Sequence, residues 1–193
     1  MNEPQIRGTA VSAVFGFIKK HYGEALLRDI VNRLPIEHQR PFQKLVLPIS
    51  WYPVASYELF LALAHQEISK QTQETQIEFE KRMFLSESKL MQSIYKFVFS
   101  LMQPTALLAR LPSFLGRLYD QGEVKLIENR AGHCLLRYSG PRSLYAHMRR
   151  SCIPGNTHFL EIGGATQLQL QFPVEQVDDQ TYLFEMLITY QMP

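Results

Sequence analysis

The feature that most constrains the fold is a change in the spacing of apolar residues at Gly122. Before this glycine, apolar side chains recur every three or four residues, as on one face of a helix. After it they alternate with polar side chains, as in half-buried strands. The sequence therefore predicts an α+β protein, in which an N-terminal helical lobe is followed by a four-stranded antiparallel sheet with short inserted helices.

The helical spacing covers residues 1–120. Residues 77–103 predict two helices with a break at Ser86–Ser88. The segment between Pro48 and Pro53 is expected to be extended, because residues before proline avoid the helical region. The other helices expected in this part cover residues 11–22, 26–34, 37–44, 54–64 and 105–120.

Residues 123–193 predict a hairpin, two short helices and a second hairpin. The first short helix is expected over Ser143–Cys152 and ends at Pro154-Gly155, and the second is expected over Asn156–Ile162 with Asn156 as its N-cap. The hairpins are expected over residues 124–138 and 167–188. The whole chain, residues 1–193, is expected to form a single domain.

Composition excludes several classes of protein. The chain has 193 residues, 46% of them hydrophobic, so it can bury a core, and its net charge of +2 is too small to indicate a nucleic-acid partner. No segment approaches the roughly 20 apolar residues of a transmembrane helix. The first residues, MNEPQIRG, have no secretory pattern, so a cytoplasmic protein is expected.

Motifs that would indicate an enzyme or a metal site are lacking. The sequence has no glycine-rich phosphate loop, HExxH, CxxC or GxSxG motif, and its six histidines are scattered. We therefore expect no catalytic residue, no metal ligand and no enzymatic activity. Cys134 falls on a strand, where a small core residue is expected. Cys152 lies close to Arg149 and Arg150, which could lower its pKa.

One short stretch could bind a ligand. Tyr138 to Tyr145 reads YSGPRSLY, which places Arg142 between a strand and a helix. An arginine at such a junction can bind a carboxylate or phosphate together with helix N-terminal amides. Alternatively, Arg142 bonds the carbonyls of its own turn or pairs with a surface acid.

Three segments resemble the heme nitric-oxide/oxygen binding (H-NOX) domains. Residues 7–23 resemble the opening helix of that family, and residues 52–64, YPVASYELFLALA, resemble its Tyr-Pro helix. YSGPR at residues 138–142 resembles the Tyr-x-Ser-x-Arg motif by which the family binds heme propionates. Tyr138 and Arg142 match that motif, which implies that they bind a ligand, whereas a glycine replaces the serine.

The chain also departs from this family. The resemblance would place a heme-ligating histidine on the helix expected at residues 105–120, but no histidine occurs between His65 and His133. Conventional heme ligation is therefore not expected, and we predict no cofactor. The sequence is also similar to 4-vinyl-reductase-like domains and TRAPP tethering subunits. It resembles most a heme-less family of short paralogous myxobacterial proteins, through Trp51-Tyr52-Pro53, Pro104 and Gly163-Gly164-Ala165.

Two functions follow from these observations. The first is a non-enzymatic signalling or sensor-type domain that binds a small, amphipathic or acidic ligand in a cavity between helices and sheet, with Tyr138 and Arg142 as ligand-binding residues. Such a domain would pass its signal to a protein partner in trans. The alternative is a protein–protein interaction scaffold or adaptor with a filled core and no ligand, which could form a homodimer.

Overall fold

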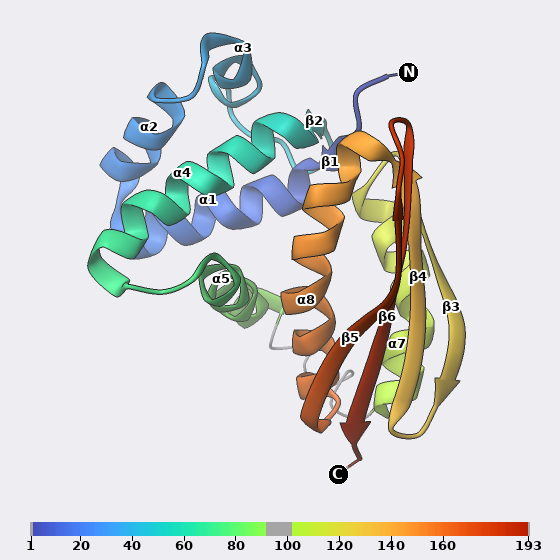
Figure 1. The fold of residues 1–193 in the computed structure, drawn as a ribbon. Coiled ribbons are helices and arrows are strands. Elements are labelled where there is room, and N and C mark those ends of the chain that lie inside the picture. Colours follow the sequence, from blue (N-terminus) through green and yellow to red (C-terminus); the bar gives the residue numbers. More distant parts are fainter. Residues whose placement is uncertain (1, 92–101, 193) are drawn as a thin grey trace. The chain divides into compact units, whose positions relative to one another are not determined.

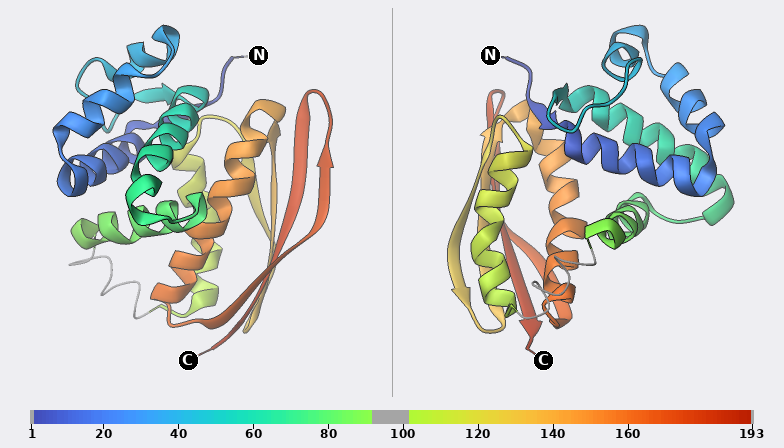
Figure 2. Two further views of the ribbon diagram at one scale, coloured as in Figure 1. Left: turned by 60° about the vertical axis from the view of Figure 1, so that its left-hand side comes forward. Right: turned by 180° about the vertical axis from the view of Figure 1, so that it is seen from behind.

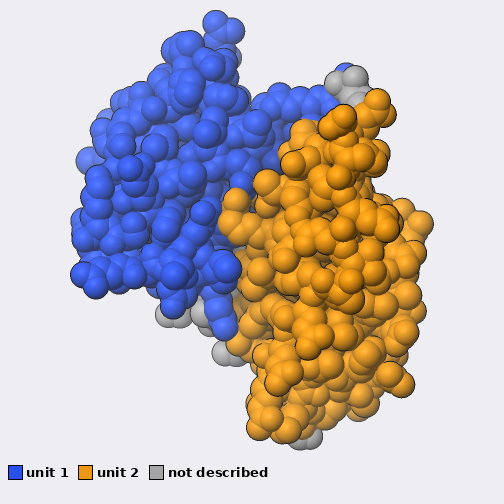
Figure 3. Space-filling view, viewed as in Figure 1, with its two compact units in different colours: residues 1–87, 118–120 blue, residues 88–117, 121–193 orange. Residues whose placement is uncertain are grey.

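The computed structural model describes residues 2–91 and 102–192, and for residues 84–91 it describes the backbone alone. The chain forms two compact units, which are coloured separately in Figure 3. Unit 1 comprises residues 1–87 and 118–120, and unit 2 comprises residues 88–117 and 121–193.

Unit 1 is mainly helical, as the spacing of its apolar residues predicts (Figure 1). Rings from three elements meet in its core, where Phe15 lies 4.7 Å and Phe42 5.7 Å from Phe60. Its elements are β1 (Gln5–Arg7), α1 (Gly8–Tyr22), α2 (Glu24–Asn32), α3 (Ile36–Gln39), η1 (Arg40–Phe42), β2 (Trp51–Pro53), α4 (Val54–Thr72) and α5 (Gln76–Met91), the last of which continues beyond residue 87.

A short antiparallel pair, β1 with β2, joins the segment before α1 to the segment before α4. The extended segment predicted between Pro48 and Pro53 is confirmed only for its second half, which forms β2, because residues 48–50 form a turn. In the pair, Ile6 lies opposite Tyr52. Ile6 also forms an isolated bridge with Tyr119, and the Gln5 N–H donates to Asp120 Oδ1 at 2.7 Å. These contacts explain why residues 118–120 belong to unit 1.

Gly8 allows the chain before β2 to pack against the start of α1. The Gly8 N–H donates to Ser50 O at 2.8 Å. A Cβ atom at position 8 would lie 2.0 Å from Leu47 O, a distance that real atoms do not adopt. The position of residues 47–50 in unit 1 therefore depends on the absence of a side chain at Gly8.

Unit 2 contains the predicted four-stranded antiparallel sheet, with strand order β3-β4-β6-β5. Buried apolar residues alternate along β4 and β6 and so lie on one face, and α7 and α8 lie on one side of the sheet (Figure 2, left). Phe114 on α7 contacts Phe159 on α8, with ring centroids 5.4 Å apart. The elements are α7 (Pro104–Leu118), β3 (Glu123–Arg130), β4 (His133–Pro141), η2 (Arg142–Leu144), α8 (Tyr145–Ile162), β5 (Thr166–Val177) and β6 (Thr181–Gln191).

The prediction of two short helices in unit 2 is wrong. A single helix, α8, runs from Tyr145 to Ile162, with Pro154 inside it. Residues 148, 152, 156 and 160 are spaced by four and all are buried, so one continuous stripe packs both before and after the proline. Burial of that stripe outweighs the backbone hydrogen bond that Pro154 cannot make.

The break predicted at Ser86–Ser88 is also wrong, because α5 is continuous from Gln76 to Met91. The second helix predicted within residues 77–103 falls largely on residues 92–101, outside the described residues. Of the helices in the described ranges, none is long and apolar enough to span a membrane.

We expect Gly8→Ala to destabilise unit 1 by roughly 1–3 kcal/mol, because the new methyl group would overlap Leu47 O. Urea unfolding monitored by fluorescence would measure the change. Gly155→Ala is the matched control, since a Cβ there meets nothing within 4 Å and alanine favours the helix. Equal stability of the two variants would contradict this account of Gly8.

Candidate ligand-binding site

The stretch from Tyr138 to Tyr145 joins the end of β4 to the start of α8. The ladder between β4 and β6 continues to the pair Pro141–Thr181. The Arg142 N–H then donates to Gln180 O at 2.8 Å, so the turn before α8 is bonded to the turn between β5 and β6. Residues far apart in the sequence are thereby brought together at one end of the sheet.

Tyr138 lies in the core of unit 2 and has no exposed surface. Its ring stacks on Phe184, with centroids 4.8 Å apart, and its hydroxyl accepts a hydrogen bond from Asn156 Nδ2 at 2.7 Å. Burial raises the pKa of the Tyr138 phenol well above its ordinary value, so this group is neutral at physiological pH.

Asn156, the hydrogen-bond partner of Tyr138, was assigned to the wrong part of the helix by the sequence analysis. It lies in the middle of α8 and is buried, so its predicted role as an N-cap is wrong. Its Nδ2 also donates to Cys152 O at 2.7 Å, one helical turn earlier. Among the described residues, Asn156 Oδ1 has no hydrogen-bond partner. The signal that could have identified Asn156 is its four-residue spacing from Cys152 and Leu160 on a single apolar face.

Tyr182 fills the space beside Gly140, the position where the H-NOX motif has serine. A Cβ at Gly140 would lie 3.2 Å from Tyr182 Cε1 and 3.0 Å from Gly122 Cα. The Tyr182 hydroxyl is buried and has no hydrogen-bond partner within the described part of the chain. Burial raises the pKa of this phenol as well.

Arg142 is exposed, unlike Tyr138. Its guanidinium lies 5.1 Å from the centroid of the Tyr145 ring, and the Tyr145 hydroxyl donates to Glu175. Tyr138 and Arg142 therefore occupy opposite environments, one in the core and the other at the surface. Their predicted role as ligand-binding residues stays a prediction.

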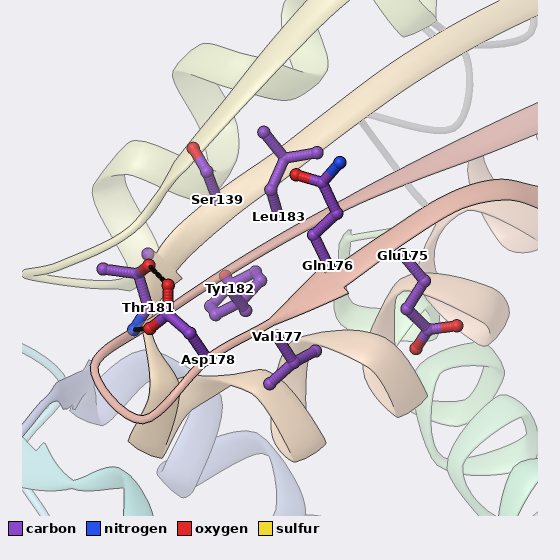
Figure 4. Close-up of a pocket in the computed structure, with 9 residues that line it drawn as sticks. Ser139, Glu175, Gln176, Val177, Asp178, Thr181, Tyr182 and Leu183 are labelled. Atoms are coloured by element: carbon purple, nitrogen blue, oxygen red, sulfur yellow. Dashed lines mark hydrogen bonds between the residues drawn. The ribbon is translucent and has the colours of Figure 1, made fainter.

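An open pocket of about 740 Å³ lies at the same end of the sheet (Figure 4). At the turn, Asp178 accepts hydrogen bonds from the Gln180 and Thr181 N–H groups, and these bonds lower its pKa. The pocket is lined by Ser139, Gly140, Glu175, Gln176, Val177, Asp178, Thr181, Tyr182 and Leu183. Only Ser139 and Gly140 lie in the stretch that sequence analysis singled out, because the other lining residues come from strands distant in sequence.

The cysteines are buried and unpaired with each other. Burial raises the pKa of the Cys134 thiol to about 12 and that of Cys152 to about 12. Arg149 favours the Cys152 thiolate, but burial outweighs it, so the lowered pKa considered from the sequence is wrong. The Arg149 guanidinium lies over the Phe172 ring at 3.2 Å and pairs with Glu175. Within the described residues, no group of three or more His, Cys, Asp or Glu side chains could hold a metal ion.

Comparison with known proteins identifies the fold. No protein-family model matches the chain, and no curated protein matches it. Among solved structures, the unliganded Fe(II) H-NOX protein from K. algicida matches with a TM-score of 0.67 at 11% identity, over 96% of this chain and 97% of that chain. An oxygen-binding H-NOX domain related to soluble guanylate cyclases matches with a TM-score of 0.64 at 13% identity, over 97% and 96%. A mutant of the T. tengcongensis H-NOX matches with a TM-score of 0.64 at 11% identity, over 97% and 99%.

The chain therefore has an H-NOX-like α+β fold, which confirms the fold that the sequence resemblance implied. Sequence identity at this level shows the fold alone. The relation to a heme-less myxobacterial family stays a prediction.

The Tyr138–Asn156 hydrogen bond can be tested by a double-mutant cycle in urea unfolding. We expect Tyr138→Phe to cost about 1 kcal/mol and Asn156→Ala about 2–4 kcal/mol, since the alanine leaves a cavity and a buried hydroxyl without its partner. The double variant should cost less than the sum, because Tyr138→Phe removes that hydroxyl. Strict additivity would contradict a direct interaction.

Stability should fall as pH rises above about 9, where thiols of the unfolded chain lose their protons. Folded Cys134 and Cys152 keep theirs until a pKa of about 12, so the folded state binds more protons between these values. Unfolding at pH 8, 9.5 and 11 under reducing conditions measures the slope. Cys134→Ala/Cys152→Ala should flatten it by roughly 1.4 kcal/mol per pH unit for each thiol. An unchanged slope would contradict this assignment.

Proposed function

We propose that this chain is a non-enzymatic, sensor-type domain that binds a small amphipathic acid without conventional heme ligation. Its fold supports a ligand-binding role, because solved structures with this fold include an oxygen-binding domain in its oxygen complex and a protein described by its Fe(II) state. Analogy of fold raises this expectation, and the residues at the candidate site define it further.

The residues of unit 2 do not fit a conventional heme site. Helix α7, Pro104–Leu118, contains no histidine, cysteine or tyrosine that could ligate iron. The Tyr138 hydroxyl is buried and bonded to Asn156, so it is not available to a propionate in this arrangement. The serine of the family motif is replaced by Gly140, and the Tyr182 ring lies against that position.

The observation that carries the proposal is that two buried polar atoms beside the aromatic cluster around Phe184 lack hydrogen-bond partners among the described residues. These atoms are Asn156 Oδ1 and the Tyr182 hydroxyl oxygen. A buried polar group without a hydrogen bond destabilises a fold by about 1–3 kcal/mol. Proteins retain such groups where a ligand or an ordered water satisfies them. Both side chains adjoin one aromatic cluster, since Asn156 donates to Tyr138, and Tyr138 and Tyr182 each stack on Phe184.

Arg142 supplies the charge that an acidic ligand requires. It is exposed, two residues after the pocket residue Gly140, and its N–H bonds to the turn that forms the pocket. Glu175 and Asp178 would repel a carboxylate elsewhere in the pocket. We therefore place the acidic end of the ligand at Arg142 and its apolar part against Tyr182.

A second candidate function, the interaction scaffold, has its own supporting observation. The space between the helices and the sheet of unit 2 is filled by fully buried side chains, among them Leu136, Tyr138, Leu144, Leu160, Phe184 and Met186. A filled core fits a scaffold that binds a protein partner or forms a homodimer. We propose that the sensor, too, acts through a signalling partner in trans, in the cytoplasm.

Native mass spectrometry of the purified protein, compared with its denatured spectrum, tests these alternatives. A mass that is present only in the native state would support the sensor and identify its ligand. A bare monomer or dimer would favour the scaffold. A heme mass would contradict the absence of conventional ligation.

The role of Arg142 can be tested with decanoate as a probe of amphipathic acids. We expect Arg142→Ala to weaken decanoate binding about tenfold in calorimetric titration, since a charge-assisted hydrogen bond contributes about 1.5–3 kcal/mol. Arg117→Ala, which removes an exposed arginine from the end of α7, is the matched control and should leave binding unchanged. Equal affinity of the Arg142→Ala variant and the unaltered protein would exclude this role.

A further inference from the structure

Four exposed apolar side chains of unit 1 lie close together in sequence, on the loop between η1 and β2 and at the first residue of β2. Leu45 is 82% and Ile49 81% exposed, and Leu47 and Trp51 are 45% and 37% exposed. These four residues are called the apolar loop below. Single exposed apolar residues are common on protein surfaces, but four within seven consecutive positions indicate a surface that contacts something apolar.

Several backbone groups of the apolar loop form hydrogen bonds within unit 1. The Leu47 N–H donates to the Tyr52 hydroxyl at 2.9 Å, and Leu47 O accepts from the Ser50 N–H at 3.1 Å. Ser50 O accepts from the Gly8 N–H, and Pro48 has no N–H to satisfy. Each backbone group that is paired internally lowers the cost of moving the loop from water to a lipid surface.

The charged residues closest to the apolar loop in the sequence are positive. Arg40 and Lys44 precede it, and no aspartate or glutamate occurs between Glu37 and Glu58. The Arg7 guanidinium lies 4.1 Å from the centroid of the Trp51 ring and donates to Ile49 O at 2.9 Å. Cations beside exposed apolar side chains complement a membrane that carries anionic lipids.

We propose that the apolar loop binds the surface of an anionic lipid bilayer, with Leu45 and Ile49 inserted and Trp51 at the level of the headgroups. Tryptophan is enriched at this level of membranes, because its ring is apolar and its N–H is polar. The four side chains expose on the order of 500 Å², below the roughly 800 Å² per partner of a stable protein–protein interface. A fluid lipid surface, in contrast, needs no complementary groove.

Trp51 provides a direct measurement, because it is the single tryptophan of the chain. We expect its emission to shift to the blue when the full chain is mixed with vesicles of phosphatidylcholine containing 30% phosphatidylserine. Lipids brominated near the headgroup should quench it. Unchanged emission together with no co-sedimentation would overturn the proposal.

Variants separate the apolar and the charged contributions in co-sedimentation with the same vesicles. Leu45→Ser/Ile49→Ser should weaken binding about tenfold or more, because both side chains lose the apolar surface that they bury in the lipid. The matched control Ile77→Ser/Ile127→Ser changes two apolar residues outside the apolar loop and the pocket that are each 41% exposed, and it should bind like the unaltered protein.

Arg40→Gln/Lys44→Gln should weaken binding to these vesicles about tenfold, and 0.5 M salt should have a similar effect. Both loop residues of the Leu45→Ser/Ile49→Ser variant are largely exposed, so circular dichroism should show an unchanged fold. If this variant binds vesicles normally, the proposal is wrong. Another outcome is that the unaltered protein does not bind vesicles but self-associates in sedimentation velocity, and that this variant abolishes the self-association. In that case the proposal is wrong and the apolar loop is an interface between copies.

Discussion

The hydrogen bond from Asn156 to Tyr138 connects α8 to the sheet, and the packing of unit 2 depends on it. It joins the middle of α8 to β4, the strand that lies between β3 and β6. The Tyr138 ring that carries the hydroxyl stacks on Phe184. Because both groups are buried, losing either partner leaves a polar atom in an apolar environment. This contact lies on the side of α8 that faces the sheet, within the buried stripe that continues through Pro154.

The same contact gives Tyr138 of the YSGPR motif a structural role in the core. In the motif that it resembles, a tyrosine, a serine and an arginine bind propionates. Here the tyrosine is a core residue, the serine position is a glycine beside Tyr182, and only Arg142 is exposed. A chain can thus keep the H-NOX-like fold while the residues at the end of β4 serve core packing. The polar atoms of Asn156 and Tyr182 that lack partners in the described part of the chain are what favours a ligand of another kind.

In unit 1, a single glycine allows an exposed loop to pack against the start of a helix. Gly8 allows Leu47 O and Ser50 O to approach the start of α1, and these contacts hold the loop that carries Leu45 and Ile49. The exposed side chains project from a loop whose backbone is bonded to unit 1 at Leu47, Ile49 and Ser50. The two proposals therefore concern different units, one a ligand at the end of the sheet and the other a lipid surface at the apolar loop.

The sequence by itself determined the class of fold and the order of most elements, because the spacing of apolar residues changes at Gly122 from that of helices to that of strands. It also determined that α7 lacks a histidine. Only the tertiary structure decided that α8 is continuous and that Asn156 is buried. Local signals such as Pro154-Gly155 favour a break, and burial of one stripe against the sheet outweighs them. The pocket, too, was beyond sequence analysis, since it forms where strands distant in the chain become neighbours by hydrogen bonding.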